Sequence, residues 1–217
     1  MNGKTKRLTL IGMLCALAVL AVALIRIPVV LFLKYEPKDV IIVLGGLMLG
    51  PVSSVIISVV ASLVEMLTIG TTGLWGLLMN VIASCAFACT AAAIYKKKRT
   101  ANGAVAGLLC GTAAMAVTML LWNYLITPIY MGTPREVVAG MLLPTFLPFN
   151  LVKGGLNTGI TLLIYKPLIT ALRKARVLDG MKQPKEASMK IDPAMLILGL
   201  VLLVGCVLLV LRLNGTI

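Results

Sequence analysis

The chain has 217 residues, of which 60% are hydrophobic and only 12% are charged. A soluble domain of this length needs a far more polar surface, which excludes ordinary soluble enzymes and binding modules. The formal charge of +13 suggests a nucleic-acid partner, but no basic face interleaved with aromatic residues appears, so this class is excluded as well. The composition indicates an all-α protein that crosses a lipid bilayer several times.

Long apolar segments follow one another along the chain. They cover residues 8–33, 40–68, 75–95, 102–126, 142–171 and 194–211. The second segment, as one helix, would be about 43 Å long, against a hydrocarbon core of about 30 Å. It contains "GGLMLGP" (45–51), and Gly50-Pro51 is a strong helix breaker. We therefore expect two shorter segments, 40–49 and 52–68.

Basic residues predict the orientation of these spans. Clusters at 4–7 and 95–99 flank apolar segments, as cytoplasmic loops do. Splitting the second segment puts four spans between the clusters, so that both become cytoplasmic. The sequence thus predicts a multi-pass protein of the cell membrane with a cytoplasmic N-terminus and six spans within residues 1–175. A cytoplasmic linker (176–193) and an extra transmembrane helix (194–211) follow, which places the C-terminus outside the cell.

The sequence shows no pattern typical of an enzyme or a metal site. All five cysteines lie inside apolar runs and the chain has no histidine. Cys85 and Cys89 share a helix face, but no third ligand is in reach, so we interpret them as small packing residues. Walker A and GxSxG patterns are absent, so we expect no catalysis, no ATP hydrolysis and no cofactor. The N-terminal apolar run is too long for a signal peptide, and we expect it to be retained.

Polar residues gather at the outer ends of the predicted spans. Arg26, the loop "LKYEPKD" (33–39), Glu65 and Asn123 all lie on this side. Structural alternatives exist for each of them. Arg26 and Glu65 could form an ion pair between two spans, Asn123 could cap its helix, and the loop could simply be solvated.

Lys153 is the most informative of the polar residues within the spans. A lysine at mid-depth in a bilayer costs about 2.5–3.5 kcal/mol on insertion scales, so such residues usually face a cavity or a partner. Asn150, Lys153 and Asn157 are spaced i, i+3 and i+7 and therefore share one helical face. Gly154 and Gly155 beside them permit another backbone to approach. We expect Lys153 to contact a ligand; snorkelling or a purely structural ion pair is the alternative.

Four stretches resemble the S components, the substrate-binding membrane subunits of energy-coupling factor (ECF) vitamin transporters, and among these the riboflavin-specific ones. They are "LKYEPKDVIIVLGGLMLGP" (33–51), "GLWGLLMNVIAS" (73–84), "WNYLITPIY" (122–130) and "LPFNLVKGGLN" (147–157). The resemblance covers residues 1 to about 175. It implies the six-helix S-component bundle, to which 194–211 would be an addition. The implied ligand is riboflavin as cargo rather than cofactor, and whether FMN also binds stays open.

The resemblance also implies partners and site residues. The partners are a transmembrane T component and two ATPase subunits, whose ATP hydrolysis would topple the S component and deliver the ligand inward. The small residues Gly12 and Ala16 would dock on the T component, with ordinary packing inside the subunit as the alternative. Residues 34–39 would form a lid over an outward-facing pocket. The implied substrate contacts are Lys34, Tyr35, Asp39, Asn80, Asn123, Tyr130, Asn150, Lys153 and Asn157.

Other functions stay open at this point. The chain could serve a different vitamin or vitamin precursor, or it could be a structural membrane subunit without a transport role. A proton- or sodium-coupled carrier usually has more spans and recognisable inverted halves. No role is implied for 194–211, so we expect deletion of residues 180–217 to leave substrate binding intact.

Overall fold

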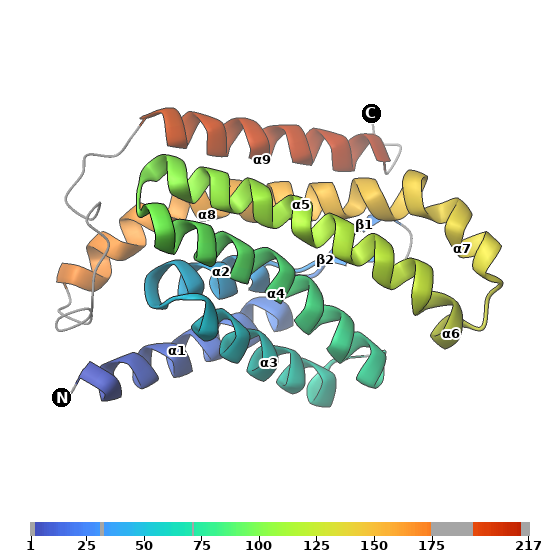
Figure 1. Cartoon of the computed structure of the whole chain (residues 1–217), viewed down its shortest axis with the longest axis horizontal. Coiled ribbons are helices and arrows are strands. Elements are labelled where there is room, and N and C mark those ends of the chain that lie inside the picture. Colours follow the sequence, from blue (N-terminus) through green and yellow to red (C-terminus); the bar gives the residue numbers. More distant parts are fainter. Residues whose placement is uncertain (1–2, 31–32, 71, 175–192, 214–217) are drawn as a thin grey trace.

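The computed structural model describes residues 3–30, 33–70, 72–174 and 193–213. These ranges are almost entirely helical (Figure 1). The helices are α1 (Gly3–Leu24), α2 (Lys38–Leu49), α3 (Pro51–Thr68), α4 (Gly73–Lys98), α5 (Ala101–Leu125), α6 (Thr127–Met131), α7 (Arg135–Met141), the π-helix η1 (Leu142–Phe146), α8 (Leu147–Lys174) and α9 (Pro193–Leu213). Two short strands, β1 (Ile27–Val30) and β2 (Leu33–Tyr35), pair as an antiparallel hairpin.

Six helices in the described part of the chain are long and apolar enough to cross a membrane. They are α1, α3, α4, α5, the continuous α7–η1–α8 and α9. With the short α2, the first five make the predicted six-segment bundle, and α9 is the predicted additional helix. The expected fold class is therefore confirmed.

The second apolar segment is divided where the sequence predicts it. Gly50 has φ of +97° and ends α2, and Pro51 begins α3. A positive φ suits glycine, and a proline fits the first turn of a helix because its missing N–H would be unpaired there anyway. With only 12 residues, α2 is too short to cross the bilayer, since it rises about 18 Å. It is instead enclosed by α1, α3, α4 and α8.

The first span is shorter than the sequence predicts. We expected it to continue to residue 33, but α1 ends at Leu24 and the chain turns into the β1–β2 hairpin. Pro28 cannot continue a helix and disfavours helical backbone at the residue before it, and Val29 and Val30 favour a strand. Hydropathy alone missed this change because the hairpin is as apolar as the helix.

The last core span contains a π-helical segment. η1 joins α7 to α8, and the N–H of Leu147 donates to the carbonyl of Leu142, five residues earlier. Pro148 has no N–H for the carbonyl of Pro144, so the regular α-helical bond is impossible there, and a wider turn accommodates both prolines. The segment carrying Asn150 and Lys153 begins directly after this irregular turn.

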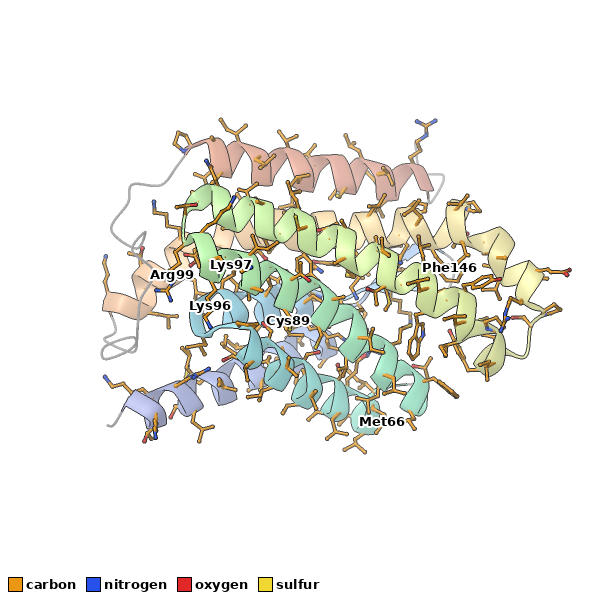
Figure 2. The ribbon with its side chains drawn as sticks, viewed as in Figure 1. Met66, Cys89, Lys96, Lys97, Arg99 and Phe146 are labelled. Carbon is orange, nitrogen blue, oxygen red and sulfur yellow. The ribbon has the colours of Figure 1, made fainter. Side chains whose placement is uncertain are left out.

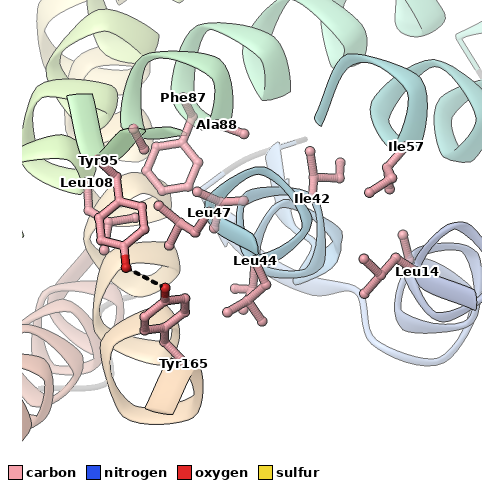
Figure 3. Packing of buried hydrophobic residues seen from close by; sticks show 14 of the residues in the cluster. Leu14, Ile42, Leu44, Leu47, Ile57, Phe87, Ala88, Tyr95, Leu108 and Tyr165 are labelled. Carbon is pink, nitrogen blue, oxygen red and sulfur yellow. Dashed lines mark hydrogen bonds between the residues drawn. The ribbon is translucent and has the colours of Figure 1, made fainter. Parts of the chain in front are cut away.

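The hydrophobic core surrounds α2. Figure 3 shows Ile42 beside Ile57, and Leu44 and Leu47 on the side of Tyr95 and Tyr165. The hydroxyl groups of these two tyrosines are hydrogen-bonded at 2.8 Å, with the rings edge to face. The bond joins α4 to α8 and satisfies both polar tips inside the core.

The two basic clusters lie at the same end of the bundle. Arg7 donates to the carbonyl oxygen of Leu49 at 3.2 Å. Leu49 lines a cavity of about 150 Å³ together with Lys96 and Arg99, and Figure 2 shows Lys96, Lys97 and Arg99 close together at this end of α4. Both clusters therefore lie at one end of the bundle, and its cytoplasmic location stays a prediction.

Candidate functional site

Two buried polar clusters meet at the first turn of α2. The side chains of Lys38 and Asp39 are consecutive in sequence, and both are 0% exposed. Each belongs to a different cluster, one toward α8 and one toward α3. The two clusters therefore both depend on the start of this half-length helix.

The first cluster, the Asp39 cluster, joins four elements. It comprises Tyr35 (β2), Asp39 (α2), Ser84 (α4), Lys153 and Asn157 (α8). Lys153 Nζ lies 3.0 Å from Asp39 Oδ2, and Ser84 donates a hydrogen bond to the other carboxylate oxygen. The Tyr35 hydroxyl donates to Asn157 Oδ1 at 3.0 Å, and Asn157 Nδ2 donates to Asp39 at 3.5 Å. One carboxylate thus organises two polar residues of α8.

The second cluster, the Lys38 cluster, contains two cations, two carboxylates and an amide. Its members are Arg26, Glu36, Lys38, Glu65 and Asn80. Lys38 pairs with Glu36 at 2.9 Å and with Glu65, and Arg26 pairs with the same two carboxylates at 3.3 and 3.2 Å. Asn80 donates to both oxygens of Glu65. The hairpin, α2, α3 and α4 are thereby connected, and the formal charges cancel.

The pairing explains why these charges are tolerated. A buried ion costs several kcal/mol unless a partner and hydrogen bonds compensate for its lost hydration. Lys38, Asp39 and Lys153 all have such partners. Burial, and next the negative charge of Asp39, raise the pKa of Tyr35, so its hydroxyl stays protonated and donates to Asn157.

The structure brings together four of the predicted substrate contacts. Tyr35, Asp39, Lys153 and Asn157 form most of the Asp39 cluster, whereas Asn80 belongs to the neighbouring Lys38 cluster. Lys34 is exposed on β2, at the start of the predicted lid. Tyr130 is half-buried on α6, and no hydrogen bond joins either residue to the clusters within the described ranges. The contact of all nine residues with a ligand stays a prediction.

Asn123 and Asn150 are buried but bond within their own segments. Asn123 donates to the carbonyl of Met119 at 2.7 Å and accepts from Thr127 at 2.9 Å. It lies inside the last turn of α5, whose C-cap is Ile126, so it is not the cap itself. Asn150 donates to the carbonyl of Phe146 at 2.8 Å. Both side-chain amides are thus fixed by hydrogen bonds that involve neither the Asp39 cluster nor the Lys38 cluster.

The sequence missed several members of the clusters. Ser84 lies in an apolar run, where a single serine gives no signal of its role. Lys38 and Glu36 appeared only as solvated or lid residues of the first loop. The alternative of an Arg26–Glu65 ion pair is confirmed, with 3.2 Å between the charged atoms. No group of three possible metal ligands occurs among the described residues.

The predicted docking residues lie on an open face of α1. Gly12 and Ala16 are both exposed, and a side chain added at Gly12 would meet nothing within 4 Å. Met13, Leu17 and Leu20 are also about half exposed. The face is therefore apolar, with Gly12 and Ala16 as small residues between larger exposed side chains, and docking there stays a prediction.

Comparison with known proteins gives consistent results. Residues 6–165 match the family model described as "ECF transporter, substrate-specific component". The chain is 31% identical to the riboflavin transporter FmnP of Bacillus subtilis (strain 168), over 80% of this chain and 99% of the relative. It is 28% identical to the riboflavin transporter RibU of Staphylococcus aureus (strain TCH60), over 80% and 100%.

A solved structure also matches. It is described as the "structure and mechanism of the S component of a bacterial ECF transporter" and superposes with a TM-score of 0.67 at 30% identity. The match covers 78% of this chain and 99% of that one. The six-segment core is thus similar over nearly the whole length of the solved protein.

Proposed function

Because the chain belongs to the family of substrate-specific components of ECF transporters, we propose that it binds riboflavin and is the riboflavin-binding S subunit of such a transporter. Two relatives named as riboflavin transporters match it over nearly their full lengths. The single structural observation that carries the proposal is the buried Asp39 cluster, which fixes Lys153 and Asn157 on one face of α8. The chain is a non-enzymatic subunit, and riboflavin is its cargo rather than a cofactor.

The chemistry of the site suits a flavin. An isoalloxazine ring presents a broad apolar face and a polar edge of carbonyl oxygens and ring nitrogens. A lysine ammonium has three donors, of which Asp39 takes one at 3.0 Å, and the others are available for a carbonyl or hydroxyl oxygen. Asn150 and Asn123 add amides that both donate and accept. A few fixed polar groups in an apolar environment are the usual means of orienting a small molecule.

Family membership also underlies the proposed partners and orientation. ATP hydrolysis by two ATPases would drive inward delivery, and the apolar face around Gly12 and Ala16 would meet the T component. The basic end of the bundle, with Arg7, Lys96 and Arg99, would face the cytoplasm according to the positive-inside rule. The Asp39 cluster then lies in the outer half, where riboflavin arrives.

The proposal predicts a coloured protein. Purified from cells supplied with riboflavin, the chain should show the visible absorption bands of a flavin, and the stripped protein should quench added riboflavin fluorescence at a one-to-one ratio. FMN and thiamine, tested in the same titration, measure selectivity. A folded preparation that is colourless and fails to quench riboflavin would refute the assignment and leave another vitamin as the ligand.

Asn150→Ala separates binding from folding. Its amide donates to the carbonyl of Phe146 in the adjoining η1 turn, so the change breaks no hydrogen bond to another part of the bundle. We expect riboflavin affinity to fall about 10- to 100-fold, because a buried polar edge of the ligand would lose its partner. The matched control is Asn102→Ala, an exposed asparagine near the start of α5, at the basic end of the bundle. Equal affinity in the two variants would place the ligand away from Asn150.

A further inference from the structure

α9 packs against the bundle along the whole of one face. Figure 1 shows it running beside α8, with its last turn near β1, and its first turns line a cavity together with α5. The matched family region ends at residue 165, before α9 begins. FmnP is matched over 99% of its length while 80% of this chain is covered, so about a fifth of this chain has no counterpart there. Whatever α9 does is an addition to the shared core.

The contact between α8 and α9 is a direct approach of two backbones. A Cβ added at Gly159 would lie 2.9 Å from the carbonyl oxygen of Gly199, and one added at Gly199 would lie 3.1 Å from that of Gly159. One turn earlier on α8, Gly155 leaves room for the Cys206 sulfur. Small residues at such crossings are what allow membrane helices to pack tightly. α9 is therefore fitted to α8 and is not merely tethered beside it.

The C-terminal half of α9 covers the hairpin and the site-bearing part of α8. Three side chains, spaced i, i+3 and i+7, pack on a small hydrophobic cluster of their own. They are Leu203, Cys206 and Val210, and the cluster consists of Val29, Tyr35, Phe149, Val152 and Leu156. Tyr35 is the residue that bonds to Asn157. α9 thus packs against the hairpin and α8, the two elements that contribute Tyr35, Lys153 and Asn157 to the Asp39 cluster.

We propose that α9 is a positioning element for the ligand site, which holds the β1–β2 hairpin against α8 and so keeps Tyr35 on Asn157. A two-stranded hairpin is marginally stable alone, and its position depends on what packs against it. The Lys38 cluster fixes the hairpin at one end, and α9 supports its apolar side. This inference rests on the proposed ligand binding and reverses the sequence-based expectation that residues 180–217 are dispensable for it.

A matched pair of glycine variants tests the proposal. Gly199→Leu should push α9 away from α8, whereas Gly205→Leu, on the same helix, meets nothing within 4 Å. Riboflavin release from the full-length protein in nanodiscs is followed by fluorescence recovery after a chase. We expect release to be roughly tenfold faster in Gly199→Leu and unchanged in Gly205→Leu, because loss of a positioning contact acts mainly on the dissociation rate. Equal release rates in the two variants would overturn the proposal.

A reversible crosslink gives the second measurement within one folded protein. Gly155→Cys places a thiol beside Cys206, and a mild oxidant should join the two into a disulfide that fixes α9 on α8. Release should then be slower than from the same protein reduced, while the wild type shows no effect of the oxidant. Absence of the crosslink, or equal rates in both states, would contradict the proposal. A wild type that never binds riboflavin would instead refute the proposed function, and the crosslink still reports the packing.

Discussion

Replacing Lys153 with methionine should abolish high-affinity riboflavin binding and lower the free energy of unfolding by about 3–5 kcal/mol. The stability loss arises because Asp39, which is 0% exposed, would lose the ammonium group 3.0 Å away that compensates for its burial. Ser84 and Asn157 would remain as neutral donors and compensate only in part. The loss is measured by thermal or denaturant unfolding in detergent, and binding by fluorescence quenching.

A double variant tests whether the role of Lys153 is structural alone. Lys153→Met with Asp39→Asn removes both charges, so stability should recover most of the loss while riboflavin binding stays absent. Lys166→Met, on the same helix, is the control and should change neither quantity. Recovery of binding together with stability would mean that Lys153 is purely structural, the alternative that the sequence left open.

The fold was predictable where the hydropathy pattern is compatible with only one arrangement of helices. Gly50-Pro51 inside an overlong apolar run forces a break, and the break appears at that residue pair. The β1–β2 hairpin was not predictable in the same way, since "IPVV" is as apolar as the span before it. Pro28 was the available signal. It was outweighed because sequence hydropathy does not distinguish an apolar strand from an apolar helix.

The site was predictable along one helix but not between helices. The i, i+3, i+7 spacing places Asn150, Lys153 and Asn157 on a common face of α8, and two of the three meet Asp39. Their partners, Asp39 and Tyr35, are 114–122 residues away in sequence. Nothing local to Ser84 indicates that it bonds to that carboxylate. Pairings of this kind depend on which helices become neighbours, and apolar spans of similar length leave that choice undetermined.

The Lys38 cluster leads to a second large effect. Lys38→Met should lower the free energy of unfolding by about 3–5 kcal/mol, because Glu36 and Glu65 would share Arg26 as their one remaining cation in the cluster. Lys34→Met is the matched control, since Lys34 is exposed on β2 and a surface change of this type usually costs less than about 0.5 kcal/mol. Thermal unfolding of the two variants under identical detergent conditions makes the comparison.

A second substitution that restores the charge balance also tests Lys38, but its expected effect on riboflavin binding differs from that for Lys153. Lys38→Met combined with Glu65→Gln restores charge balance, since Arg26 and Glu36 remain as a pair at 3.3 Å. If Lys38 only positions the start of α2, this double variant regains both stability and most of its riboflavin affinity. A stable double variant without binding would instead make Lys38 a direct ligand contact. Asp39 follows Lys38 directly in α2 and points to the other cluster. The ion pairs that fix the Lys38 side chain therefore also fix the direction of the Asp39 side chain.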